Sequence, residues 1–146
     1  MASRRKSREL ALQMLFQWEV GQHQPQEVLA TFFSDRNARA EVKDFARSLF
    51  EGTVAEVESL DPLLRRHAEH WRLERMAAVD RNVLRLALHE LLHHPETPPA
   101  VVINEALELA RRFSTAESVE FVNGVLDAVR KSLAPVNSGA LEPLTH

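Results

Sequence analysis

Four cationic side chains, Arg4, Arg5, Lys6 and Arg8, open a stretch that has the apolar spacing of an amphipathic helix. The N-terminus of a helix carries partial positive charge and exposes unpaired N–H groups, so cations placed there cost stability. An anionic partner offsets that cost. Phosphate is the best candidate, because N–H groups, the helix dipole and guanidinium groups can all bind it. These residues therefore predict a nucleic-acid site at this end of the chain.

Aromatic residues near both ends of the chain suit single-stranded RNA, whose unstacked bases lie on aromatic faces while cations hold the phosphates. Phe16 and Trp18 follow the cations, and Phe121 falls at the edge of the apolar face of the last predicted helix. Aromatic residues at helical spacing also build cores, so the residues alone leave RNA binding and core packing equally open. RNA binding by both groups requires the first and last helices to lie close together.

The segment His89 to His93 matches H-E-x-x-H, a helical motif in which two histidines bind zinc beside a general-base glutamate. On a helical wheel the two histidines share a polar face with Asn82 and Arg85, and we expect this face to be solvated. The longer forms of the motif carry a third histidine at fixed spacing, which is missing here. We therefore predict no catalytic residue, no metal and no cofactor. A zinc hydrolase and a purely structural helical adaptor stay as alternatives.

The overall composition is that of a single, slightly acidic domain. The chain has 146 residues, of which 45% are hydrophobic, and 18 Lys and Arg stand against 21 Asp and Glu. The basic character of the N-terminal segment is therefore local. The absence of cysteine excludes a disulfide scaffold and fits a reducing cytosol. We also expect no membrane span, because no apolar run has the required length.

Apolar residues recur at helical spacing and no stretch alternates with the period of a strand, so we predict an all-α fold. We expect seven helices: about Ser3 to Val20, Pro25 to about Phe33, about Ala38 to Leu60, one capped by Asp61 with Pro62 at its first position, about Arg75 to His93, one capped by Thr97 with Pro98 first, and one from the capping box Ser114–Glu117 to Leu133. Gly52 is expected to mark a close helix contact. Residues 1–134 form the predicted domain, and residues 135–146 are expected to be a disordered tail.

Four segments together resemble the bacterial transcription antitermination factor NusB family, in matching order and spacing. They are Arg4–Gln13, Val79–Ala87, Val102–Ala110 and Phe121–Asp127. The resemblance covers residues 4 to about 132, and it implies the seven-helix NusB fold and a non-enzymatic, cytoplasmic RNA-binding protein.

The resemblance also implies partners. Together with NusE, a ribosomal small-subunit protein, such a protein binds the single-stranded boxA element of nascent ribosomal RNA transcripts. The complex then joins elongating RNA polymerase with other Nus factors and suppresses premature termination. Some family members self-associate, so a homodimer stays open for this chain.

The resemblance assigns roles to particular positions. Arg4, Arg5, Lys6 and Arg8 would contact RNA phosphates, Phe16 and Phe121 match aromatic positions associated with RNA, and Glu117 stands where the family often has Asp.

Asp80 matches an acidic position that faces NusE, which is a basic protein, so its charge would help to orient that partner. An internal helix cap is an equally good interpretation of Asp80. Two positions depart from the family pattern. Glu120 is acidic beside Phe121, which suggests weaker RNA binding, and His89 stands where the family commonly has Tyr.

Overall fold

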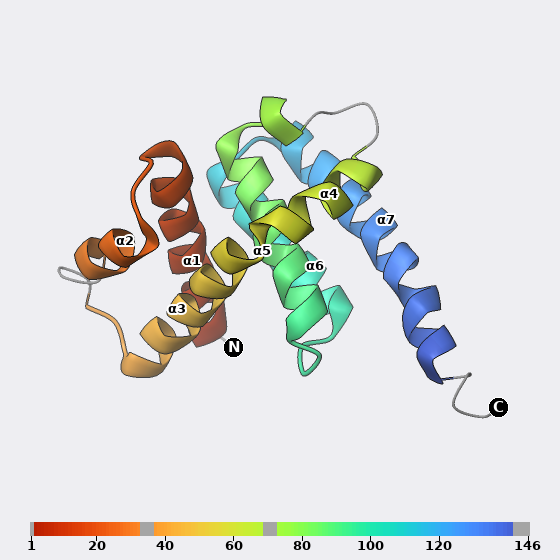
Figure 1. Ribbon diagram of the computed structural model, residues 1–146, viewed down its shortest axis with the longest axis horizontal. Coiled ribbons are helices and arrows are strands. Elements are labelled where there is room, and N and C mark those ends of the chain that lie inside the picture. The colour runs from red at the N-terminus through yellow and green to blue at the C-terminus, as the bar shows by residue number, and fades with distance from the viewer. Residues whose placement is uncertain (1, 33–36, 69–72, 142–146) are drawn as a thin grey trace.

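The computed structural model describes residues 2–32, 37–68 and 73–141, and over these ranges the chain is helical with no strand. This confirms the predicted all-α class. The helices are α1 (Ala2–Val20), α2 (Pro25–Phe32), α3 (Ala40–Ala55), α4 (Val57–His67), the short 3-10 helix η1 (Leu73–Arg75), α5 (Ala78–His93), α6 (Pro99–Phe113) and α7 (Ala116–Leu141) (Figure 1). The predictions made for Phe33 and for residues 142–146 lie outside the described residues.

Helix α5 is the centre of the molecule. It packs against α1, α3, α4, α6 and α7, and it is buried from Asn82 to Glu90. Figure 1 shows α1, α2 and α3 on one side of α5 and α7 on the other. The core that these helices share includes Met14, Leu15, Leu49, Phe50, Leu84, Leu88 and Leu126. The first helix is therefore held by its apolar face, and its opening residues lie beside α5 and α6.

The third and fourth helices meet at a different residue from the one predicted. The break falls at Glu56, with φ −110° and ψ 8°, so α3 is shorter than expected and Pro62 lies inside α4. Asp61 does not cap a helix. Its carboxylate instead accepts two hydrogen bonds of 2.8 Å from the Arg85 guanidinium. A buried guanidinium must be paired, and this requirement gives Asp61 its role.

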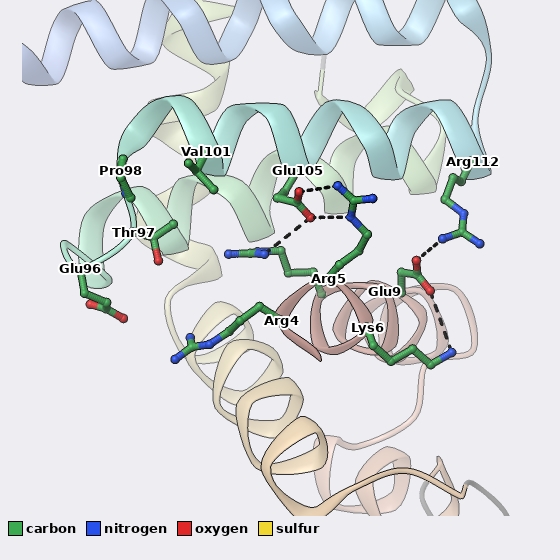
Figure 2. Close-up of a pocket in the computed structure, with 11 residues that line it drawn as sticks. Arg4, Arg5, Lys6, Glu9, Glu96, Thr97, Pro98, Val101, Glu105 and Arg112 are labelled. Atoms are coloured by element: carbon green, nitrogen blue, oxygen red, sulfur yellow. Dashed lines mark hydrogen bonds and ion pairs between the residues drawn. The ribbon is translucent and has the colours of Figure 1, made fainter. Parts of the chain in front are cut away.

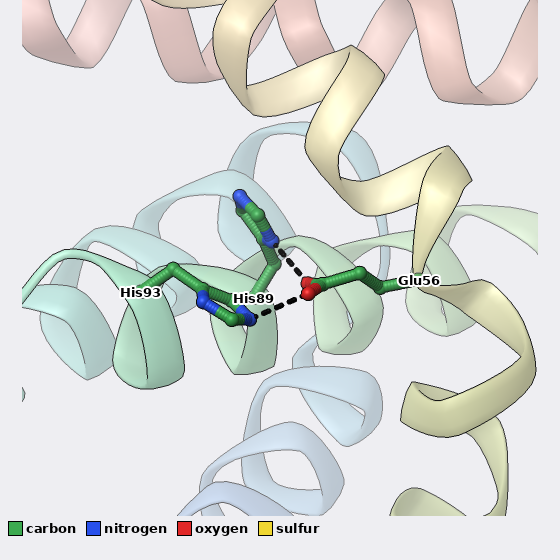
Figure 3. A group of neighbouring side chains, drawn as sticks. All are labelled: Glu56, His89 and His93. Carbon is green, nitrogen blue, oxygen red and sulfur yellow. Dashed lines mark hydrogen bonds and ion pairs between the residues drawn. The ribbon is translucent and has the colours of Figure 1, made fainter.

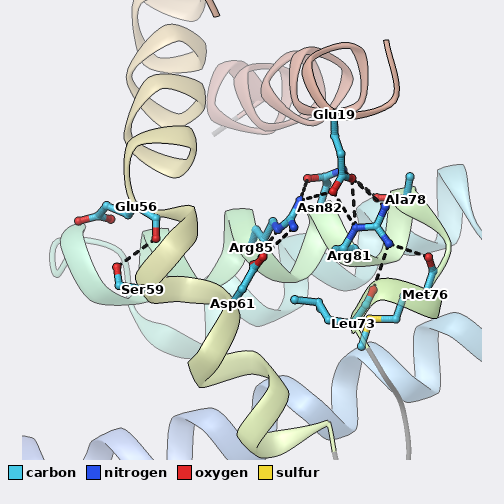
Figure 4. A network of polar contacts seen from close by, with 10 residues as sticks. All are labelled: Glu19, Glu56, Ser59, Asp61, Leu73, Met76, Ala78, Arg81, Asn82 and Arg85. Carbon is cyan, nitrogen blue, oxygen red and sulfur yellow. Dashed lines mark hydrogen bonds and ion pairs between the residues drawn. The ribbon is translucent and has the colours of Figure 1, made fainter. Parts of the chain in front are cut away.

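Most of the polar face of α5 is buried, which corrects the prediction that it is solvated, whereas His93 at its end is exposed as predicted. Asn82, Arg85 and His89 are all 6% exposed or less. Glu19 of α1 binds both Arg81 and Arg85, at 2.9 and 2.8 Å (Figure 4). Asn82 also donates to Glu19, at 3.0 Å. Because each buried charge has a partner, this face joins α1 and α4 to the central helix.

The last two helices each begin one residue later than predicted. Helix α6 has Pro98 as its N-cap and Pro99 as its first residue. At the start of α7 the Ser118 N–H donates to Thr115 Oγ1 at 3.1 Å, so Thr115 is the capping residue. Helix α7 also runs past Leu133 to Leu141, into the segment that we expected to be disordered.

No helix in the described part of the chain has both the length and the apolar character that crossing a membrane requires.

Glu19 provides a test of the buried network. Burial alone would raise the pKa of this carboxyl, but hydrogen bonds and charges from Arg81 and Arg85 outweigh burial, and its pKa is lowered from the ordinary value of 4.5. A carboxylate with a lowered pKa stabilises the fold above pH 4.5, and that contribution is lost as the pH falls through its folded-state pKa. We predict that Glu19→Gln lowers the free energy of unfolding by about 2 kcal/mol at pH 7. Urea unfolding from pH 7 to pH 3 measures this, and a loss that is independent of pH would contradict it.

Candidate nucleic-acid interface

A groove of about 790 Å³ lies between the N-terminal half of α1 and helix α6 (Figure 2). Its lining residues come from α1, from the turn before α6 and from α6 itself: Arg4, Arg5, Lys6, Arg8, Glu9, Glu96, Thr97, Pro98, Val101, Glu105 and Arg112. Five of these are cationic and three are acidic. All four cations that the sequence predicted for RNA binding line this one groove.

Arg5 spans the groove and binds Glu105 of α6. Its Nε and Nη2 donate to the two Glu105 carboxylate oxygens at 3.1 and 2.8 Å, and its side chain stays 49% exposed. This hydrogen bonding lowers the pKa of Glu105 and raises the pKa of Arg5. Both groups are therefore charged at neutral pH, and a phosphate at this point must share Arg5 with Glu105.

Arg4 and Lys6 are the more accessible cations of the groove. The Arg4 guanidinium lies 3.7 Å from the centre of the Phe45 ring. This cation–π contact does not neutralise the charge of Arg4. Lys6 is 55% exposed and lies 4.0 Å from Glu9, at the limit of an ion pair. Figure 2 shows both side chains extending away from α6. These two cations can reach a phosphate at little cost to the fold.

Arg8 is buried, although the sequence predicted that it would be exposed and contact RNA phosphates. It is 5% exposed, and it donates to both carboxylate oxygens of Glu90 at 2.9 and 2.5 Å. Its Nη1 also lies 3.6 Å from Glu105. Because a buried charge must be paired, Arg8 fixes α1 against α5 and α6 rather than facing solvent. Glu90, the glutamate of the H-E-x-x-H motif, is thereby held by Arg8 and is not free to act as a hydrolytic base.

Sequence reasoning missed Arg112 and Glu9, which close the other end of the groove. Arg112 of α6 binds the Glu9 carboxylate of α1, and 55% of its side chain stays exposed. The available signal was the pair Arg111 and Arg112 in the last turn of α6, where cations are favoured by the helix dipole. No sequence pattern showed that this turn lies beside the first helix.

The aromatic residues predicted for RNA contact lie on different helices that do not pack closely on one another. Phe16 of α1 is 40% exposed, whereas Phe121 of α7 is half-buried against the core. Glu117, in the first turn of α7, is exposed. The main contacts of α1 are with α2, α3 and α5, and those of α7 are with α4, α5 and α6. The predicted close approach of the first and last helices is therefore absent from the main helix contacts, and Phe121 does not line the groove.

Asp80 lies at the start of α5 and is 7% exposed. Its carboxylate accepts hydrogen bonds from the Ser114 and Ser118 hydroxyls, each at 2.7 Å. These bonds tie the first turn of α5 to the first turn of α7. Asp80 is therefore not the internal helix cap considered above, because α5 has Ala77 as its N-cap with no side-chain cap hydrogen bond; Asp80 links two helices instead.

Comparisons with known proteins agree with the resemblance in the sequence. The model of the NusB family matches residues 5–131. The transcription antitermination protein NusB of Koribacter versatilis is 55% identical over 132 residues, which are 90% of each chain. The NusB structure from T. maritima is 38% identical, with a TM-score of 0.81 over 88% of this chain and 90% of that one.

A solved complex of the antitermination factors NusB and NusE with double-stranded RNA contains a further similar chain. It is 26% identical, with a TM-score of 0.83 over 90% of this chain and 98% of that one. The relatives are named as regulators of transcription, in agreement with the prediction that this chain is not an enzyme.

The buried position of Arg8 leads to a prediction that separates it from its neighbours. Arg8→Met leaves the Glu90 carboxylate buried without a partner, so we expect the free energy of unfolding to fall by about 3 kcal/mol. Lys6→Met, the matched control on the exposed side of α1, should change it by less than about 0.5 kcal/mol. Adding Glu90→Leu to Arg8→Met should restore part of the loss. Urea unfolding measures all three variants, and equal effects of Arg8→Met and Lys6→Met would refute a structural role for Arg8.

Proposed function

The chain belongs to the NusB family, and we propose that it is a transcription antitermination factor that binds the single-stranded boxA element of nascent ribosomal RNA together with NusE. The complex joins elongating RNA polymerase in the cytoplasm, with other Nus factors, and suppresses premature termination. Family membership supports the regulatory role, and the related complex of NusB and NusE with double-stranded RNA supports NusE and RNA as partners.

The observation that carries the RNA-binding role is the set of exposed cations on the first turns of α1. Arg4, Arg5 and Lys6 lie along one groove, with Arg112 at its far end. Their spacing along a helix suits a flexible strand, whose successive phosphates can turn toward the protein. Phe16, exposed about three turns further along α1, offers a face on which a base can stack. Glu117 and Phe121 on α7 belong to a second contact region in this proposal.

The carboxylates in the groove make a partner necessary. Glu9, Glu96 and Glu105 offset three of its five cationic charges, so the electrostatic attraction for RNA is modest. A second protein on the same RNA turns the second binding step into a local one and so raises the overall affinity. The family resemblance assigns the position of Asp80 to the side that faces NusE. Asp80 supports the binding of this partner by holding the start of α7 in place.

Selectivity for boxA tests the proposed function directly. We expect the chain with NusE to bind a boxA oligonucleotide about 100-fold more tightly than the chain alone does. A scrambled oligonucleotide of the same length and composition should gain much less. Gel-shift titrations of both RNAs, with and without NusE, measure this. Equal affinity for the two sequences in the presence of NusE would overturn the proposal.

Charge reversal in the groove tests the surface itself. The double variant Arg4→Glu, Lys6→Glu should weaken RNA binding about tenfold or more and reduce the salt dependence of log K by about 1.4, because each lost phosphate contact on a single strand removes about 0.7. The double variant Arg47→Glu, Arg66→Glu, on the exposed surfaces of α3 and α4 outside the groove, is the control, because it changes the net charge by the same amount. Fluorescence anisotropy between 50 and 200 mM salt, the range over which such contacts weaken measurably, reports both quantities. Similar losses in the two double variants would show that the groove is not the binding surface.

A further inference from the structure

A group of polar side chains that RNA binding does not use lies where the turn between α3 and α4 meets the end of α5. His89 and His93 stand one helical turn apart on α5, and Glu56 approaches them from that turn (Figure 3). Glu56 Oε1 lies 2.9 Å from His89 Nδ1, and Oε2 lies 2.7 Å from His93 Nε2. One ligand atom from each residue lies within 4.8 Å of the other two. Two imidazole nitrogens and a carboxylate therefore face one another.

We propose that Glu56, His89 and His93 bind a divalent transition metal ion, with Zn²⁺ the best fit and water as the fourth ligand. Imidazole nitrogen and carboxylate oxygen are ligands that zinc prefers, whereas Ca²⁺ and Mg²⁺ prefer oxygen alone. Metal–ligand bonds of about 2.0–2.1 Å place neighbouring ligands of a tetrahedron about 3.4 Å apart. The two contacts between Glu56 and the histidines need to lengthen by only about 0.5–0.7 Å to reach this spacing.

The surroundings hold these ligands in place before an ion binds. The His89 ring packs on Gly52, where an added Cβ would clash with its Cε1 atom, so the close contact that the sequence predicted at Gly52 is confirmed. The His94 ring meets His89 edge-on at 5.6 Å. The Glu56 N–H donates to the Gly52 and Thr53 carbonyls, each at 3.2 Å. A site whose ligands are already oriented binds a metal with less loss of side-chain freedom.

One side of the cluster is open to solvent. The side chains of His93 and Glu56 are 46% and 32% exposed, while that of His89 is 7% exposed. An ion can therefore enter from the surface and keep a water ligand. Glu90, next to His89, is bound to Arg8, and Glu56 is itself a ligand, so neither carboxylate is free to serve as a base. The ion would join the α3–α4 turn to α5 as a structural link, without hydrolytic activity.

Metal titration of the full chain tests the proposal, which does not depend on RNA binding. After treatment with EDTA, calorimetric titration with ZnCl₂ should reach saturation at one ion per chain. The bound ion should also raise the Tm of the chain in a thermal unfolding scan. Titration with CoCl₂ should give the intense visible absorption of tetrahedral Co²⁺ with nitrogen and oxygen ligands. The absence of saturable binding, or the weak spectrum of octahedral hydrated Co²⁺, would overturn the proposal.

Three single variants locate the ion. His93→Gln and Glu56→Gln should each weaken Zn²⁺ binding by about tenfold or more, since each removes a ligand. His23→Gln is the matched control, because this exposed histidine lies between α1 and α2, outside the cluster. Circular dichroism and RNA binding, which should be unchanged in all three, show that the variants fold. Equal Zn²⁺ affinity of His93→Gln and His23→Gln would place the ion elsewhere and end the proposal.

Discussion

A buried ion pair between Arg8 and Glu90 determines how the first helix lies on the rest of the molecule. Two guanidinium nitrogens meet two carboxylate oxygens, and both side chains are withdrawn from water. Because either charge alone would be costly in this position, the pair favours one register of α1 against α5. In that register the three preceding cations, Arg4, Arg5 and Lys6, stay at the surface along the groove beside α6. The structural cation thus positions the cations that we assign to RNA.

The groove has a mixed charge pattern, and this bears on how the protein works. Glu105 binds Arg5 and also lies near Arg8, and Glu9 binds Arg112. An incoming phosphate must compete with these carboxylates for the cations. The groove therefore positions its cations well, but its electrostatic attraction for RNA is modest. Such a surface favours shared binding with a second protein over tight binding alone. The slight negative charge of the whole chain agrees with this, because it provides no general attraction for nucleic acid.

The fold and the cation cluster on α1 could largely be predicted from the sequence, because both depend on local patterns, but the groove that the cluster forms with α6 could not. Apolar spacing predicted the helices, and the cation cluster with the four family segments predicted the function. Pairing across the chain could not be predicted in this way. The polar residues of α5 looked solvated because nothing near them in sequence shows that Glu19 and Asp61 reach them. Arg8 looked like its neighbours for the same reason, since Glu90 lies on a distant helix. Glu56 likewise completes a histidine pair from a turn that the sequence placed inside a helix.

The central claim is that the exposed cations between α1 and α6 form the RNA-binding surface. Backbone amide chemical shifts of the isotope-labelled chain, recorded while a boxA oligonucleotide is added, test it most directly. The account predicts that the largest changes fall on Arg4 to Lys6 and around Arg112, with little change at the Glu56 turn. Changes concentrated on α3 and α4, with the first turns of α1 unaffected, would contradict it.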